Sequence, residues 1–181
     1  MNKKRLENLS FIFSIFGLFS IIFFVIGIKN IDNYSNWFSF CILCVICGIL
    51  LALIIRFFLC ILEPKAKTYK NSKGFGFLNQ LIFGFILTSF GALRLINEYK
   101  IRETECKMYK ILDIGKSGSK TPQHFVFING ENGEERLSFG EKFNENHQAE
   151  DSINLCIHKG FLGFKFYETT RTKMLPKTHY N

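Results

Sequence analysis

Three long apolar runs without a charge constrain this chain more than any other feature. Residues 9–28 and 74–93 each hold 20 uncharged residues, and residues 33–55 are also free of charge. At a rise of 1.5 Å per residue, 20 helical residues cover the roughly 30 Å hydrocarbon core of a bilayer. We therefore predict a membrane domain over residues 1–99 with three transmembrane helices, at about 9–28, 37–62 and 75–96.

The loops between these runs predict the orientation of the chain. Three basic residues precede the first run, and four lysines lie in the 63–73 connection, whereas the 29–36 connection carries one basic and one acidic residue. Because cytoplasmic loops carry an excess of Lys and Arg, we expect the N-terminus to face the cytoplasm. An odd number of spans then places the C-terminal part outside the cytoplasm.

The net charge of +8 is concentrated in the predicted membrane domain. Residues 1–97 hold 10 Lys and Arg against 3 Asp and Glu, while residues 98–181 hold 13 against 12. A nucleic-acid-binding surface needs basic residues clustered on the soluble part, so we expect no nucleic-acid partner. The bilayer itself is the expected environment of the first half.

Small residues at helical spacing predict how the spans pack, because they let helix backbones approach closely in lipid. Cys44, Gly48 and Ala52 share one face of the second span, and Gly84 and Gly91 share one face of the third. Cys41, Cys44 and Cys47 could also form a redox or metal-binding face. We favour a packing role, since free cysteine behaves as a small apolar residue.

From Cys106 onward the hydrophobic period changes to two, which predicts strands. Residues 151–159 alternate, with Ile153, Leu155 and Ile157 on one face and Cys156 and His158 on the other. Further short strands are predicted over 108–114, 125–128, 136–139 and 162–166, separated by Gly- and Asn-rich turns. We predict a soluble β-domain over 104–170, a five-stranded antiparallel barrel of the SH3 or OB kind, and a flexible tail over 171–181.

The stretch from Cys106 to Tyr167 resembles the β-domain of small bacterial multi-pass inner-membrane proteins without an assigned activity. The resemblance rests on Glu135-Arg136-Leu137-Ser138, on the alternation after Asp151, and on Gly160-x-Leu162-Gly163 followed by Phe166-Tyr167. It covers about a third of the chain. It implies a bacterial origin and the same architecture, and it implies no mechanism.

No catalytic, cofactor-binding or metal-binding constellation emerges from the sequence. Cys156 and His158 lie two apart on one strand face, yet two ligands without partners do not make a zinc site. We expect Cys156 and His158 to face solvent instead. In an oxidising compartment Cys106 and Cys156 could instead form a disulfide between the first and fourth strands, although connectivity does not follow from sequence.

The sequence favours a non-enzymatic inner-membrane protein whose extracytoplasmic β-domain binds a protein partner, with a homo-oligomer as the other expected assembly. The candidate contact residues are exposed positions of the last hairpin, Lys159, Lys165 and Tyr167. The alternative is a membrane effector or immunity protein that forms or blocks a membrane lesion. A channel or carrier is less favoured, since intramembrane ionisable residues mark ion paths and only Arg56 and Arg94 qualify, both near helix ends. Three spans could form a pore only by oligomerising.

Overall fold

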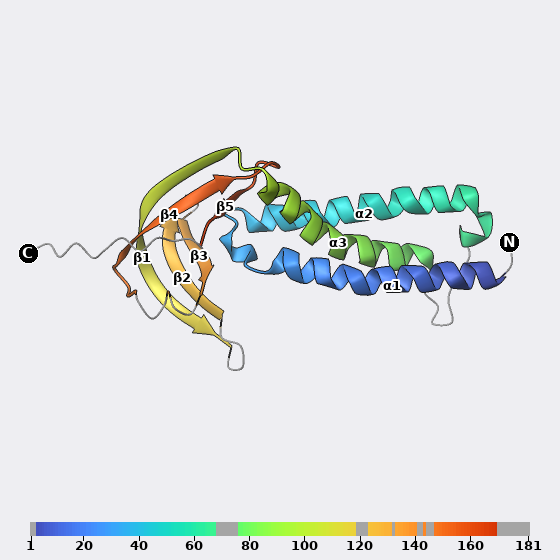
Figure 1. The fold of residues 1–181 in the computed structure, drawn as a ribbon, viewed down its shortest axis with the longest axis horizontal. Coiled ribbons are helices and arrows are strands. Elements are labelled where there is room, and N and C mark those ends of the chain that lie inside the picture. Colours follow the sequence, from blue (N-terminus) through green and yellow to red (C-terminus); the bar gives the residue numbers. More distant parts are fainter. Residues whose placement is uncertain are drawn as a thin grey trace, which may run out of the picture. The chain divides into compact units, whose positions relative to one another are not determined.

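The computed structural model describes residues 3–67, 76–118, 123–131, 133–140, 143 and 147–169. Three long helices are followed by five strands, with two short 3-10 helices in the connections (Figure 1). In chain order the elements are α1 (Lys3–Ile28), η1 (Ile31–Asn33), α2 (Trp37–Leu62), η2 (Pro64–Lys67), α3 (Phe77–Tyr99), β1 (Glu103–Ser117), β2 (Gln123–Gly130), β3 (Gly133–Phe139), β4 (Ser152–Lys159) and β5 (Lys165–Tyr167). The sequence therefore predicted the class of fold correctly: a helical bundle followed by a small all-β domain.

The chain forms two compact units, and the boundary between them is crossed more than once. One unit holds the helices, over 1–29 and 38–96, and the other holds residues 30–37 together with 97–181. The connection between the first two helices and the last residues of α3 thus belong to the β-domain unit. The sequence places both segments in the predicted membrane domain 1–99, because a hydropathy pattern does not reveal that a short polar loop packs against a distant domain.

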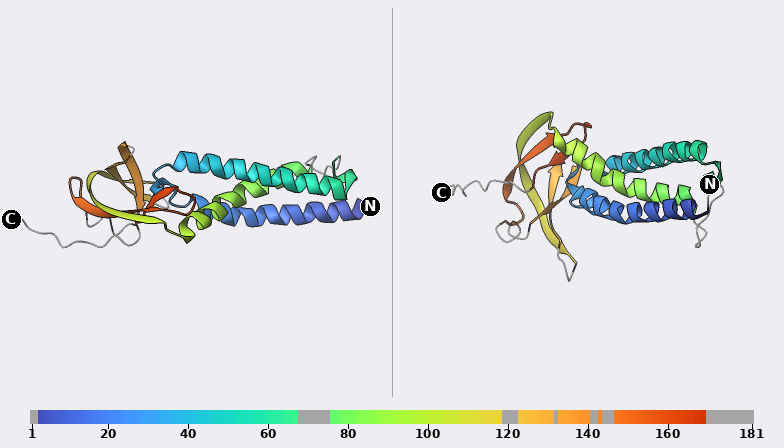
Figure 2. Two further views of the ribbon diagram at one scale, coloured as in Figure 1. Left: turned by 90° about the horizontal axis from the view of Figure 1, so that it is seen from above. Right: turned by 45° about the vertical axis from the view of Figure 1, so that its right-hand side comes forward.

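Among the described residues, three helices are long and apolar enough to cross a membrane, over Glu7–Ile28, Trp37–Leu62 and Leu78–Tyr99. Within the helical unit α3 lies against both other helices (Figure 2). A Cβ atom added at Gly48 of α2 would lie 2.5 Å from the Cα atom of Ile86, and one added at Gly84 would lie 2.6 Å from the Phe16 ring of α1. These glycines therefore mark close approaches between helices.

Small and polar residues line the inner faces of the bundle. Cys44, Gly48 and Ala52 are all buried on one face of α2, and the Ser89 hydroxyl of α3 donates a 2.5 Å hydrogen bond to the Cys44 carbonyl. Arg94 donates to backbone carbonyls at the end of α1, at 3.0 Å to Ile26 and also to Lys29. The Arg94 guanidinium thus donates hydrogen bonds to backbone carbonyl oxygens that have no partner within the last turn of a helix. This is a structural role.

The β-domain is one antiparallel sheet with the strand order β3-β2-β1-β4-β5, curled into a nearly closed barrel (Figures 1 and 2). The long β1 pairs through its first half with β4 and through its second half with β2. A first strand shared between the second and the fourth is the arrangement of an OB barrel rather than an SH3 barrel. β1 extends beyond the predicted range 108–114 in both directions, since pairing with two strands requires about twice the length.

The barrel core is built from the inward residues that alternation predicts. Its fully buried members come from four strands and include Ile111, Val126, Ile128, Leu137 and Leu155. Tyr167 of β5 joins them, with its ring 5.9 Å from that of Tyr109 in an edge-to-face arrangement. Since β3 and β5 are the two edges of the sheet, whatever lies between them decides whether the barrel is closed.

Candidate functional site at the barrel seam

The space between β3 and β5, here called the seam, is occupied by residues 30–37 from the connection between α1 and α2. On the β3 side, the Asn33 side chain accepts a 2.7 Å hydrogen bond from the Ser138 backbone N–H and donates a 3.4 Å bond to the Ser138 carbonyl. Its amide also donates to the Thr169 hydroxyl at 2.9 Å, just past β5. One buried side chain therefore ties together both edges of the sheet.

On the β5 side the same segment pairs through its backbone. The Ser35 N–H donates to the Lys165 carbonyl at 3.1 Å, and Tyr34 forms an isolated antiparallel bridge with Phe166. The two rings stack at 5.7 Å, and the Tyr34 hydroxyl donates to the Glu98 carboxylate at 3.1 Å. Residues 34–35 thus act as a very short sixth strand.

Two polar contacts fix the segment to β3 near the tip of the β2–β3 hairpin. The Arg136 guanidinium lies 2.5 Å from the Asp32 carboxylate, and the Ser35 hydroxyl donates to Glu135 at 3.0 Å. Both ion-pair partners are partly exposed, so solvent screening limits what this pair contributes to stability. Its main effect is to hold residues 32–35 beside the hairpin.

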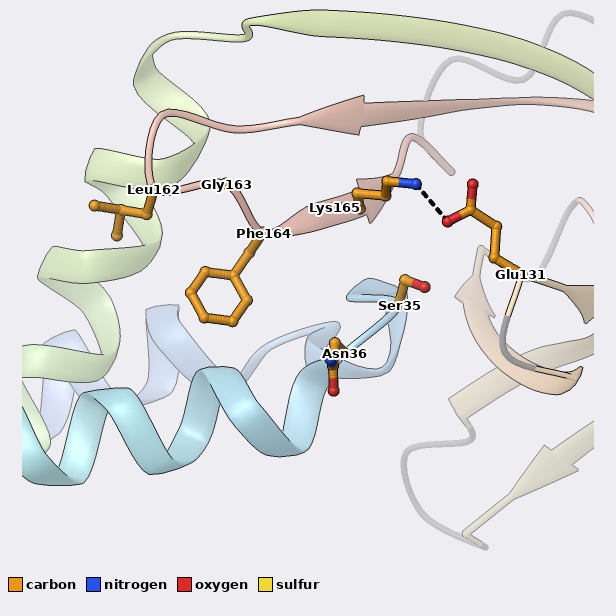
Figure 3. Close-up of a pocket in the computed structure, with 7 residues that line it drawn as sticks. All are labelled: Ser35, Asn36, Glu131, Leu162, Gly163, Phe164 and Lys165. Carbon is orange, nitrogen blue, oxygen red and sulfur yellow. Dashed lines mark hydrogen bonds and ion pairs between the residues drawn. The ribbon is translucent and has the colours of Figure 1, made fainter.

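Two cavities open on either side of Ser35. The first has a volume of about 330 Å³, and its walls come from the loop segment, the β2–β3 turn and the β4–β5 turn (Figure 3). An ion pair of 2.5 Å between Lys165 and Glu131 spans it. The lining residues are Ser35, Asn36, Glu131, Leu162, Gly163, Phe164 and Lys165.

The second cavity has a volume of about 400 Å³ and lies along the outer edge of β3. It is lined by Asp32, Tyr34, Ser35, Trp37, Phe127, Glu134, Glu135 and Arg136. Its lining thus includes three acidic residues, one arginine and three aromatic residues, and Arg136 is paired with Asp32. Concave sites that combine aromatic walls with a few polar groups are typical of ligand-binding surfaces.

The wall formed by the β4–β5 turn is anchored to the end of α3. Asn97 is fully buried, and its side chain accepts a 3.0 Å bond from the Leu162 N–H and donates a 3.2 Å bond to the Phe164 carbonyl. A Cβ atom at Gly160 would collide with Asn97, so only glycine permits this approach. The turn is consequently held rigidly where it borders the first cavity.

Cys106 and Cys156 face each other directly on β1 and β4, and their sulfur atoms lie 2.00 Å apart in a disulfide. Cys106 is exposed and Cys156 half-buried, so the bond lies on the outer surface of the barrel. The disulfide joins two cysteines that are 50 residues apart in the sequence.

The candidate contact residues of the last hairpin do not share one exposed surface. Lys165 borders the first cavity, while Lys159 pairs with Glu103 at 3.0 Å. Tyr167 was expected to be exposed, and this prediction was wrong, because only 2% of its surface is accessible. Tyr34 covers the outer side of Phe166, which leaves Tyr167 to fill the core.

The expectation that His158 faces solvent was also wrong, since its exposed fraction is 8%. Its Nδ1 lies 2.8 Å from the Thr104 hydroxyl and its Nε2 lies 3.0 Å from the Glu168 carboxylate. The Phe166 ring, 5.5 Å away, covers the imidazole. Strand alternation correctly places this residue off the barrel core but does not show that the outer face is covered here.

The seam residues Asn33, Tyr34 and Ser35 were not predicted as functional. Their only signal in the sequence is a run of six polar or aromatic residues, Asp32 to Trp37, between two spans. Within the described residues, no group of three or more His, Cys, Asp or Glu side chains is arranged to hold a metal ion. Comparison of the chain with known proteins finds no matching family model, no matching curated protein and no matching solved structure.

Proposed function

We propose that this chain is a non-enzymatic inner-membrane protein whose β-domain lies outside the cytoplasm and binds a protein partner at the seam. The observation that carries the proposal is the pair of cavities on either side of Ser35, lined by charged and aromatic side chains from four separate segments. Loops held by a rigid scaffold are the usual place for binding residues.

An extracytoplasmic position of the β-domain is supported by the disulfide and by the charges of the loops. Surface disulfides persist in oxidising compartments, and Cys106 and Cys156 are joined. Residues 30–37 and 97–169 also belong to one unit, so both must lie on the same side of the bilayer. Two spans, α2 and α3, separate them, which satisfies that requirement, and the positive loops favour an N-terminus in the cytoplasm.

The proposal is tested by photo-cross-linking in intact bacterial cells. A photoreactive amino acid replaces Leu162 in the first cavity or Glu134 in the second, and Leu112, an exposed residue of β1 that lines neither cavity, serves as the control. We expect a discrete adduct from Leu162 and Glu134 and none from Leu112, with the partner identified by mass spectrometry. Adducts from none of the three, or equally from all, would show that the seam is not a partner site.

A further inference from the structure

The outer edge of β3 offers backbone groups to an additional strand. In an antiparallel pair, successive residues point their N–H and C=O groups alternately toward the partner strand and away from it. Ser138 points its groups away from β2, because both are bound by the side chain of Asn33. Arg136 and Glu134, two and four residues earlier on the same strand, must therefore point theirs outward as well.

Asn33 takes the place of a neighbouring strand at Ser138 only. Within the described part of the chain, no group bonds the outward N–H and C=O of Arg136 or Glu134. The second cavity lies beside these two residues, which both line it. The edge of β3 is thus paired at one end and open where the cavity provides room for another chain.

The charge of this cavity indicates what kind of chain fits. Asp32 is neutralised by Arg136, and Glu135 accepts a hydrogen bond from Ser35, which leaves the exposed carboxylate of Glu134 as the charge that a partner can reach. Trp37 and Phe127 also line this cavity. Aromatic faces and a carboxylate together favour Lys or Arg side chains, whose apolar stems lie on rings while their charges reach the acid.

We infer that the seam binds an extended segment of its partner as an added β-strand, along β3 from Arg136 to Glu134, with basic side chains of the segment directed into the second cavity. Strand addition supplies affinity through main-chain hydrogen bonds and specificity through pockets for alternate side chains. This inference rests on the proposed function. It specifies that the bound part of the partner is an extended segment with basic side chains.

Binding is measured on the full-length protein in phosphatidylcholine nanodiscs, with empty nanodiscs subtracted. The probe is a fluorescent ten-residue peptide of alternating Lys and Val, compared with its Glu-and-Val counterpart and with a Lys-and-Val peptide N-methylated at every central residue. We expect the Lys peptide alone to bind, since the Glu peptide has the wrong charge and the methylated one lacks the donors for a strand ladder.

A matched pair of variants separates the strand edge from simple charge attraction. Glu134→Ala removes the carboxylate and keeps the outward N–H, whereas Glu134→Pro removes both. Proline is tolerated where the N–H points away from the sheet, so the β2–β3 pairing should survive. We expect the peptide to bind Glu134→Pro roughly three- to tenfold more weakly than Glu134→Ala, as the loss of one backbone hydrogen bond predicts.

Equal affinities for the two variants, or equal binding of the methylated and unmethylated peptides, would overturn strand addition. So would the absence of binding by the Lys peptide. If Glu134→Pro does not fold, the comparison of the methylated with the unmethylated Lys-and-Val peptide still tests strand addition on the unaltered protein. Adducts from Leu162 and Glu134 in cells without binding of the Lys peptide would reject this inference alone, whereas the absence of adducts would reject the proposed function.

Discussion

Asn33 and Ser138 lie 105 residues apart in the chain, yet the side-chain amide of one meets both backbone groups of the other. A residue from the loop between two apolar helices thereby completes a strand edge in the β-domain. This contact makes residues 30–37 part of the barrel, and it covers the outer edge of β3 at Ser138.

Replacing Asn33 with alanine should destabilise the β-domain by about 1–3 kcal/mol, because the half-buried Ser138 groups then lack partners. The measurement is the urea midpoint of the full-length protein, followed by tyrosine fluorescence. Asn129→Ala, at an exposed position of β2, is the control and should change stability by less than about 0.5 kcal/mol. Similar effects of both substitutions would mean that the seam contact contributes nothing.

The compartment of the β-domain is tested by labelling Cys106 and Cys156 in intact cells, in a variant in which the four other cysteines, Cys41, Cys44, Cys47 and Cys60, are alanine. A membrane-impermeant maleimide should react only after a reductant is added, because both thiols are oxidised and outside. Labelling that needs lysis but no reductant would place the domain in the cytoplasm, with both thiols reduced.

The close approach between α1 and α3 should make Gly91→Ala destabilising by about 1–3 kcal/mol. The added Cβ would meet the Phe23 carbonyl oxygen and lie 3.0 Å from its carbon, and backbone atoms cannot move aside as a side-chain tip can. Gly17→Ala is the matched control, since nothing lies within 4 Å of its Cβ. Thermal unfolding in detergent should show a loss for Gly91→Ala and none for Gly17→Ala. The reverse order would contradict the packing described above.

Stability should decline in alkaline solution, partly through Tyr167. Burial raises the pKa of Tyr167 well above its ordinary value of 10, and the neighbouring carboxylate of Glu135 acts in the same direction. The folded state then holds a proton that the unfolded state loses above about pH 10. Stability is therefore complete below that pH and falls above it, by up to about 1.4 kcal/mol per pH unit.

Urea unfolding between pH 8 and 11 measures this decline. Tyr167→Phe should make it shallower, although not abolish it, because burial also raises the pKa of Tyr109. Tyr99→Phe is the control: Tyr99 is 91% exposed, so its replacement should leave the slope unchanged. An unaltered slope in Tyr167→Phe would show that its hydroxyl titrates alike in both states.

The sequence predicts those parts of the fold that depend on the spacing of hydrophobic residues within a short stretch of chain. Uncharged runs locate the three helices, and alternation such as Ile153, Leu155 and Ile157 locates the strands and their inward faces. These features depend on residues near one another in the chain. The disulfide was left open by the sequence, and only the pairing of β1 with β4 brings Cys106 opposite Cys156.

The seam could not be predicted in the same way. Residues 30–37 carry no periodicity, and the partners of Asn33 lie 105 and 136 residues further along the chain. Without Tyr34 in place, the β5 sequence suggests that Phe166 faces inward and Tyr167 outward, and the structure has the opposite arrangement. One aromatic side chain from a distant loop thus reverses the interpretation of a three-residue strand.

The split origin of the β-domain has a consequence for biogenesis. Residues 30–37 leave the ribosome more than 60 residues before β1, and both α2 and α3 lie between them and the strands. The barrel can therefore not be completed while the chain is still short: its first piece must wait until two long helices and all five strands have been synthesised.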